Sequence, residues 1–254
     1  MEQNSIKDKI LVVIPYFNSY AQGREIEYAV TGWRRHFKED FLIVVVGDYH
    51  PIVETGKDIT FIKCPRIADR KGEYRAHLDH VNKFMKVMET YPDLEGFIYT
   101  CDDIYAVNDF TLDDVLVPKI NEWDISALPT STNPWRRNNA KTKAILKQHG
   151  LTTRNYVCHL PVYYECDKLK AIYDKYDCYN NSYVVEQLYF NTYFGNNQPR
   201  YIREDGCNYK FGISTKNRKS FKIKDAFGDK IWINNTMAGW SNKLSKALAE
   251  YYGI

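Results

Sequence analysis

A strand that ends in two adjacent carboxylates is the feature that most constrains this chain. Residues 97–101 form a continuous apolar and β-prone run, which is typical of a strand buried on both faces of a sheet. Asp102 and Asp103 follow at once. Ligands of open α/β sheets bind outside the carboxyl ends of strands, and paired carboxylates favour a hard cation such as Mg²⁺ or Mn²⁺. An Asx turn that caps the next segment is the alternative interpretation.

The chain around this strand alternates apolar runs with amphipathic segments. Further strands are predicted at residues 10–16, 41–47 and 59–63, and helices at residues 24–37 and 72–90. The second helix carries His77 and His80, which we expect on the surface or at an interface. The pattern predicts an α/β fold with a mainly parallel, Rossmann-like sheet flanked by helices.

The second half of the chain is less regular. Helices are predicted near residues 109–116, 140–149, 167–175, 184–194 and 241–252, strands at 123–128, 156–164 and 230–235, and a hairpin at 200–211. We find neither an internal repeat nor a flexible linker. The sequence therefore predicts one domain over residues 1–254 with two functional halves, about 1–115 and about 116–254.

Net charge and hydropathy argue against two classes of protein, nucleic-acid binders and integral membrane proteins. The 35 basic and 32 acidic residues give a net charge of +3, which argues against a dedicated nucleic-acid binder. No apolar run approaches the ~20 residues that cross a bilayer, so no integral membrane segment is predicted. The first nine residues are polar and lack an apolar signal segment. We expect a cytoplasmic protein, with peripheral attachment at the inner membrane as a second expectation.

A basic loop precedes the helix at residues 72–90. It contains Arg66, Asp69, Arg70, Lys71 and Arg75. Free N–H groups and the dipole at a helix N-terminus add to such side-chain charge, so the loop is suited to a phosphate. A solvated basic turn is the alternative.

Two short motifs carry a resemblance to a known family. They are Ile-Pro-Tyr-Phe-Asn at residues 14–18 and Tyr-Thr-Cys-Asp-Asp at residues 99–103. The arrangement resembles nucleotide-sugar-dependent glycosyltransferases with the GT-A fold. The resemblance implies that the N-terminal α/β half binds the nucleotide and that the acidic motif binds a divalent metal on the donor diphosphate. The family's usual motif is Asp-x-Asp, whereas this chain has Asp-Asp.

A weaker resemblance is to bacterial Stealth-type capsule sugar-phosphate transferases. It rests on Phe97-x-Tyr99-x-x-Asp-Asp, on His159-Leu-Pro161 and on the Trp-Ile-Asn-Asn segment at residues 232–235. The family's first signature, an apolar-Tyr-Thr-Trp-Val-Asp-Gly start, is missing. This resemblance implies transfer of a sugar phosphate instead of a sugar.

The first resemblance implies a metal-dependent glycosyltransferase that moves a sugar from a UDP- or GDP-sugar to a glycan or cell-surface polysaccharide acceptor. A Stealth-type transferase and a catalytically silent nucleotide-sugar-binding protein are the alternatives. The expected cofactor is Mn²⁺ or Mg²⁺, held by Asp102, Asp103 and His159, although His159 can instead serve the acceptor. The general base is expected to be Glu186 or Asp205, with Glu204 as a rival. The expected donor contacts are Pro15, Tyr16, Asn18, Arg66, Asp69, Arg70, Lys71, Arg75 and Asp102.

Overall fold

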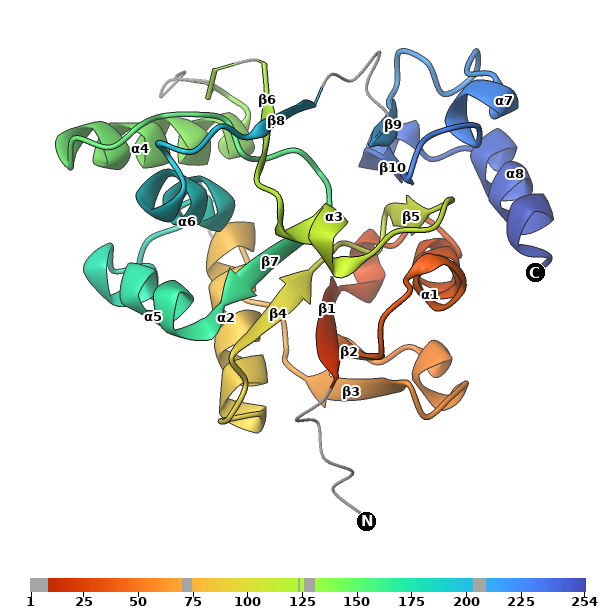
Figure 1. The fold of residues 1–254 in the computed structure, drawn as a ribbon, viewed down its shortest axis with the longest axis horizontal. Coiled ribbons are helices and arrows are strands. Elements are labelled where there is room, and N and C mark those ends of the chain that lie inside the picture. The colour runs from red at the N-terminus through yellow and green to blue at the C-terminus, as the bar shows by residue number, and fades with distance from the viewer. Residues whose placement is uncertain (1–8, 70–74, 123, 126–130, 203–208) are drawn as a thin grey trace.

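A five-stranded sheet forms the centre of the computed structural model, which describes residues 9–69, 75–122, 124–125, 131–202 and 209–254. The strand order is β3-β2-β1-β4-β7; the first four strands are parallel and the last is antiparallel to β4. Figure 1 shows this sheet flanked by helices. The predicted mixed α/β fold with a mainly parallel sheet is confirmed. The strands are β1 (Ile10–Tyr16), β2 (Phe41–Gly47), β3 (Ile59–Lys63), β4 (Gly96–Tyr99) and β7 (Val162–Glu165).

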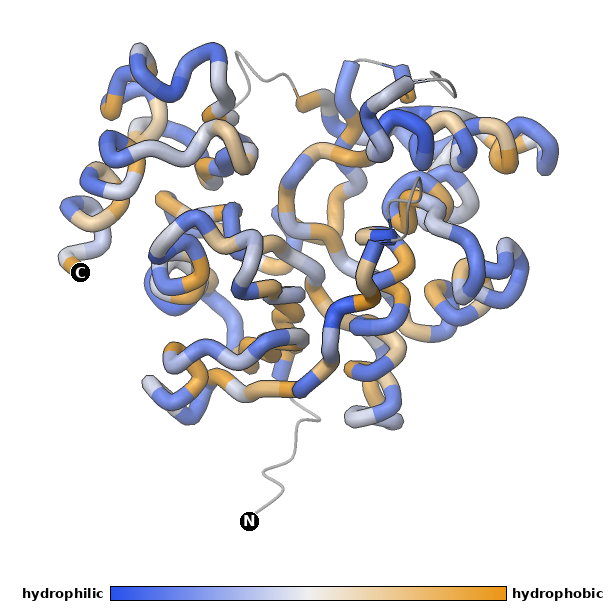
Figure 2. Tube along the Cα trace, turned by 180° about the vertical axis from the view of Figure 1, so that it is seen from behind, coloured by the Kyte–Doolittle hydropathy of each residue, from blue (hydrophilic) through white to orange (hydrophobic). Residues whose placement is uncertain are grey.

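Both faces of the sheet are buried, which explains the continuous apolar runs. Successive side chains of a strand point to opposite faces, so Val12 and Ile14 pack with α1 (Glu25–His36). Leu11 and Val13 belong to the cluster on the other face. That face is covered by α2 (Ala76–Thr90), α4 (Pro134–Gln148), α5 (Cys166–Lys175) and α6 (Val185–Tyr193). Figure 2 shows the hydrophobic residues gathered toward the middle of the molecule.

A smaller C-terminal unit packs against α1. It contains the sheet β5-β10-β9 and two helices, and its cluster includes Tyr28 and Ala29 of α1 (Figure 1). Strand β5 begins directly after Asp103, so the acidic pair lies in the turn that joins the two sheets. The elements are β5 (Ile104–Ala106), β9 (Lys210–Ile213), α7 (Ile223–Ala226), β10 (Trp232–Asn235) and α8 (Asn242–Tyr252).

Several predictions in the second half need correction. The hairpin at 200–211 is wrong, because β8 (Arg200–Ile202) pairs in parallel with β6 (Lys119–Asn121) and β9 pairs with β10. Most of the strand predicted at 123–128 lies outside the described residues. The predicted strand at 156–164 is reduced to β7, and His159 before it has a left-handed backbone with φ of 49°. A short helix, α3 (Leu112–Leu116), lies at the predicted place.

Helix α4 starts earlier than predicted. The side-chain oxygen of Asn133 accepts hydrogen bonds from the backbone N–H groups of Trp135 and Arg136, and Pro134 occupies the first turn. The predicted helix begins only at residue 140, because the polar residues before it have a turn-like composition. Within the described ranges, no helix is both long and apolar enough to cross a membrane.

Candidate active site

A pocket lies at the carboxyl ends of β1 and β4, which are paired in the sheet. The end of β2 closes tightly against this edge. Gly47 has φ of +138°, and a Cβ there would lie 2.0 Å from the carbonyl oxygen of Tyr16. Only glycine fits, and the backbone N–H of Asp48 donates to that same carbonyl oxygen at 3.1 Å.

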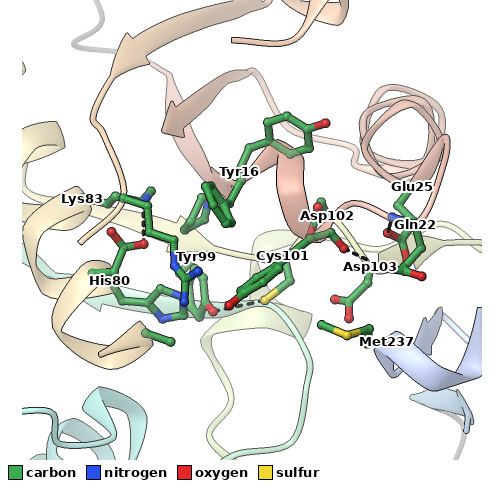
Figure 3. A pocket seen from close by; sticks show the side chains of 16 residues that line it. Tyr16, Gln22, Glu25, His80, Lys83, Tyr99, Cys101, Asp102, Asp103 and Met237 are labelled. Atoms are coloured by element: carbon green, nitrogen blue, oxygen red, sulfur yellow. Dashed lines mark hydrogen bonds and ion pairs between the residues drawn. The ribbon is translucent and has the colours of Figure 1, made fainter. Parts of the chain in front are cut away.

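The pocket combines three kinds of side chain: carboxylates, cations and aromatic rings (Figure 3). Its volume of about 210 Å³ is below the usual range of ligand pockets, so a larger ligand would extend through its open mouth. Its lining consists of Pro15, Tyr16, Phe17, Tyr20, Gln22, Glu25, Arg66, Ala76, Asp79, His80, Lys83, Tyr99, Cys101, Asp102, Asp103 and Met237.

Three carboxyl groups form the acidic side of the pocket. Burial raises the pKa of Asp102, and the charge of Asp103 raises it further. Burial also raises the pKa of Asp103, with a second contribution from Glu25. Burial raises the pKa of Tyr16 to about 12, with further contributions from the charges of Asp102, Asp48 and Glu25. The carboxylates therefore lie in a site that favours either protons or a cation.

Cys101, Asp103 and His159 converge at the end of β4. One ligand atom of each lies within 4.8 Å of the others. The side-chain amide of Asn234, from β10, is 3.1 Å from Nδ1 of His159. Oδ1 of Asp103 and Oδ1 of Asn234 are buried without a hydrogen-bond partner among the described residues. An unpaired buried carboxylate oxygen is costly, and a bound cation would offset that cost.

Arg66 forms the cationic side with Lys83. The guanidinium carbon of Arg66 lies 4.7 Å from the ring centroid of Phe17 and 4.3 Å from that of Tyr20. Lys83 is buried and bonded to Asp79, whose other oxygen accepts a hydrogen bond from the backbone N–H of Ile67 at 2.8 Å. These contacts fix both cations in place, with the charge of Lys83 paired to Asp79, so Arg66 carries the positive charge of this side of the pocket.

His77 and His80 were predicted on the surface or at an interface; His77 is instead buried, and His80 is half-buried. His77 is 7% exposed and lies 3.0 Å from the side-chain amide of Asn138. His80 lines the pocket. Burial lowers the pKa of His77 to about 3. Burial and the nearby positive charges of Lys83 and Arg66 lower the pKa of His80 to about 4, so both imidazoles are neutral at pH 7.

The structure brings some of the predicted donor residues together. Pro15, Tyr16, Arg66 and Asp102 line the pocket. Asn18 instead supports the loop: Tyr16 Oη donates to its Oδ1 at 3.2 Å, and its backbone N–H donates to Asp48.

The other predicted site residues lie beside the pocket or outside the described residues. Asp69 accepts hydrogen bonds from Arg66 and from the backbone N–H of Arg75, away from the lining. Glu186, in the first turn of α6, is also outside the lining, but its charge contributes to the raised pKa of Cys101 and of Tyr99. Arg70, Lys71, Glu204 and Asp205 lie outside the described residues.

Sequence reasoning missed Glu25 and Cys101. Glu25 is 3% exposed and accepts hydrogen bonds from Gln22 N–H and from Asn235 Nδ2. An acidic residue in the first turn of a helix is the only sequence signal for Glu25, and ordinary surface helices share it. Cys101 was counted as part of the apolar strand, although it lies one residue before the acidic pair.

Among known proteins, similarity to this chain is found in solved structures and not in sequence. Neither a family model nor a curated protein sequence matches the chain. The chain superposes over 97% of its length on the apo structure of the bifunctional glycosyltransferase WbbM, with a TM-score of 0.50, 10% identity and 50% of that chain covered. This match shows a shared fold.

Two further structures cover 97% of this chain with lower scores. A glycosyltransferase involved in the glycosylation of the major capsid of PBCV-1 is covered completely, with a TM-score of 0.43 and 12% identity. The glycosyltransferase GlyE of Streptococcus pneumoniae TIGR4 is covered over 60% of its length, with a TM-score of 0.42 and 14% identity.

Proposed function

We propose that this protein is a glycosyltransferase that moves a sugar from a UDP- or GDP-sugar to a glycan acceptor with the help of a divalent cation. The observation that supports this most is the convergence of Cys101, Asp103 and His159 just beyond the carboxyl end of β4. Cys101 and Asp103 also line a pocket whose other side carries Arg66 and Lys83. Such a pocket has groups of both signs for a metal-bound diphosphate.

The residues present fit a divalent cation. Asp103 has a buried oxygen without a partner in the described chain, and Asp102 adds a second carboxylate. His159 contributes an imidazole, which Mn²⁺ accepts more readily than Mg²⁺ does, so Mn²⁺ is the preferred candidate. A bound cation supplies positive charge that stabilises the leaving nucleoside diphosphate.

The protein's own cations complete the donor site. Arg66 is fixed between two rings and presents its guanidinium toward the pocket, where it neutralises phosphate charge without reorganisation. The neutral imidazole of His80 offers a hydrogen-bonding group beside it. Tyr16 and Phe17, at the end of β1, provide apolar surface for the donor's nucleoside.

Glu186 remains the candidate base for the acceptor hydroxyl. Burial raises its pKa, which makes its carboxylate a stronger base than an exposed glutamate. It is near enough to Cys101 and Tyr99 for its charge to raise the pKa of both, so we place the acceptor hydroxyl on the side of the pocket that these two residues line.

Product analysis tests the reaction class. The protein is incubated with UDP- and GDP-sugars and Mn²⁺ in the presence of candidate glycans, and the released nucleotide is identified. Release of a nucleoside diphosphate supports glycosyl transfer. No release from any donor, in protein that binds the donors, contradicts the proposal and favours a recognition role.

A second candidate is transfer of a sugar phosphate. One observation favours it: the side chains of His159 and Asn234, which belong to the motifs that resemble Stealth-type transferases, are in contact near Asp103. The same product analysis separates the two reactions, because sugar-phosphate transfer from a UDP- or GDP-sugar releases a nucleoside monophosphate.

A further inference from the structure

A basic surface lies on the C-terminal unit and is not used by the proposed reaction. Residues 214–224 contain five basic residues and no acidic one. Four of them are exposed: Lys216, Lys219, Lys222 and Lys224. In the described part of the chain, none of these four side chains forms an ion pair. We call these four lysines and Ile223 the basic surface.

The backbone beneath the basic surface is held in place. Asn217 accepts a hydrogen bond from the N–H of Ser214 at 2.8 Å and donates to the carbonyl of Gly212 at 2.9 Å. Phe221 is buried in the core of the C-terminal unit. Nζ of Lys243, on α8, donates to the carbonyl oxygens of Lys219 and Phe221. The lysines therefore extend from a fixed segment.

An apolar residue stands among these charges. Ile223, the first residue of α7, is 48% exposed and lies between Lys222 and Lys224 in the chain. Figure 2 shows hydrophilic stretches with short apolar interruptions in this C-terminal unit. A soluble polyanion would use the lysines alone, whereas a bilayer with anionic headgroups also accepts an apolar side chain at its interface.

The segment that carries the basic surface contacts the chain beside the mouth of the pocket. Arg218, within the same segment, donates a hydrogen bond to the carbonyl oxygen of Ala238 at 3.0 Å. The preceding residue, Met237, is 58% exposed and lines the pocket. A surface that docks on the basic segment would thus lie beside the opening through which an acceptor enters.

We propose that the basic surface docks the protein on an anionic lipid bilayer and thereby places the pocket next to an acceptor held at the membrane. The lysines complement the negative headgroups, and Ile223 enters the headgroup region. The proposal that the protein docks on a bilayer rests on the exposed lysines and on the exposed side chain of Ile223. The role assigned to the acceptor rests additionally on the proposed glycosyltransferase function.

Vesicle sedimentation tests the docking. The full chain is mixed with vesicles of phosphatidylcholine alone or with phosphatidylglycerol added, and the bound fraction is measured at several salt concentrations. We expect binding only to the anionic vesicles, weakening as salt rises. Lys222→Glu with Lys224→Glu should weaken binding roughly thirtyfold or more. The matched control is Lys57→Glu with Lys147→Glu. It changes the net charge of the protein by the same amount at two exposed lysines outside the basic surface, and should bind as the wild type.

Ile223→Ser distinguishes a bilayer from a soluble polyanion. This exposed substitution should weaken vesicle binding several-fold and leave binding to heparin unchanged. The proposal is overturned if Lys57→Glu with Lys147→Glu loses as much vesicle binding as Lys222→Glu with Lys224→Glu does. It is also overturned if Ile223→Ser binds vesicles as the wild type does. Binding is measured without any nucleotide sugar, so a protein that docks but does not turn over would leave this inference standing while the proposed function fails.

Discussion

Nδ2 of Asn235 donates a hydrogen bond to Oε1 of Glu25 at 2.8 Å, although 210 residues separate them in the chain. Both side chains are buried. The amide oxygen of Asn235 accepts a hydrogen bond from Tyr105 Oη at 2.6 Å, and its backbone N–H donates to the carbonyl of Asp103. One amide therefore connects α1, β5 and β10 immediately behind the acidic side of the pocket.

Removing this amide should destabilise the protein. Asn235→Ala removes the partner of Tyr105 Oη and of Oε1 of Glu25, while Oε2 of Glu25 keeps its bond from Gln22 N–H, so we expect a loss of about 1–3 kcal/mol in the free energy of unfolding. Urea denaturation measures it. Asn242→Ala, at an exposed position on α8, is the control and should stay within about 0.5 kcal/mol of the wild type. If the two variants have the same free energy of unfolding, the hydrogen bonds of Asn235 do not contribute to stability.

Gly47 should tolerate no side chain. In Gly47→Ala the new Cβ would meet the carbonyl oxygen of Tyr16, so the ends of β1 and β2 must separate. Gly150→Ala is the matched control, because its φ is also positive, at +66°, but nothing lies within 4 Å of a Cβ there. We expect Gly150→Ala to cost about 1 kcal/mol and Gly47→Ala clearly more, measured by urea denaturation. If Gly47→Ala loses less unfolding free energy than Gly150→Ala, the backbone of Tyr16 does not lie as close to Gly47 as described.

The buried histidines should make the protein sensitive to acid. The pKa of His77 is about 3 in the folded protein and 6.5 in an unperturbed histidine, so the unfolded chain takes up the proton first. The stability that the neutral imidazole provides is complete above pH 6.5. It is lost as pH falls from 6.5 toward 3, by up to about 1.4 kcal/mol per pH unit.

His77→Gln should flatten this dependence. We expect the difference in unfolding free energy between pH 7 and pH 5 to be smaller in His77→Gln than in the wild type, measured by urea denaturation at each pH. The exposed His149→Gln is the control for the loss of one histidine. If both variants show the same pH dependence, burial of His77 is not what makes the fold acid-sensitive.

Arg66 should contribute to donor affinity through its charge. Arg66→Met keeps a long side chain between Phe17 and Tyr20 and removes the positive charge, so nucleoside diphosphate should bind roughly tenfold more weakly and with less salt dependence. Isothermal titration calorimetry at two salt concentrations measures both effects. Arg136→Met, on the exposed side of α4, should bind as the wild type. Unchanged affinity in Arg66→Met would place its charge outside the donor site.

The first half of the fold could be predicted because its elements are locally encoded. The runs at residues 10–16 and 41–47 are short, apolar and rich in β-branched residues, which is typical of a strand with two buried faces. The hairpin at 200–211 was wrong because pairing partners are set at long range: β8 pairs with β6, about 80 residues earlier in the sequence. Short polar strands carry no signal for their partner.

The candidate site was predictable where residues follow strands directly. Tyr16 ends β1, and Asp102 and Asp103 follow shortly after the end of β4, so the sheet itself brings them to one edge. Glu25 and His80 come from helices whose orientation is set by tertiary packing, and helical periodicity placed neither in the pocket. His159 was predicted from a resemblance, and its proximity to Asp103 depends on a left-handed backbone that local pattern does not reveal.

The proposed reaction depends on Asp103 binding a divalent cation together with a nucleoside diphosphate. Calorimetric titration of Mn²⁺ with and without UDP or GDP measures this in the wild type and in Asp103→Asn, with the exposed Asp93→Asn as control. We expect weak Mn²⁺ binding alone, much tighter binding with the diphosphate, and loss of that enhancement only in Asp103→Asn. If Asp103→Asn shows the same enhancement as Asp93→Asn, Asp103 does not hold the cation.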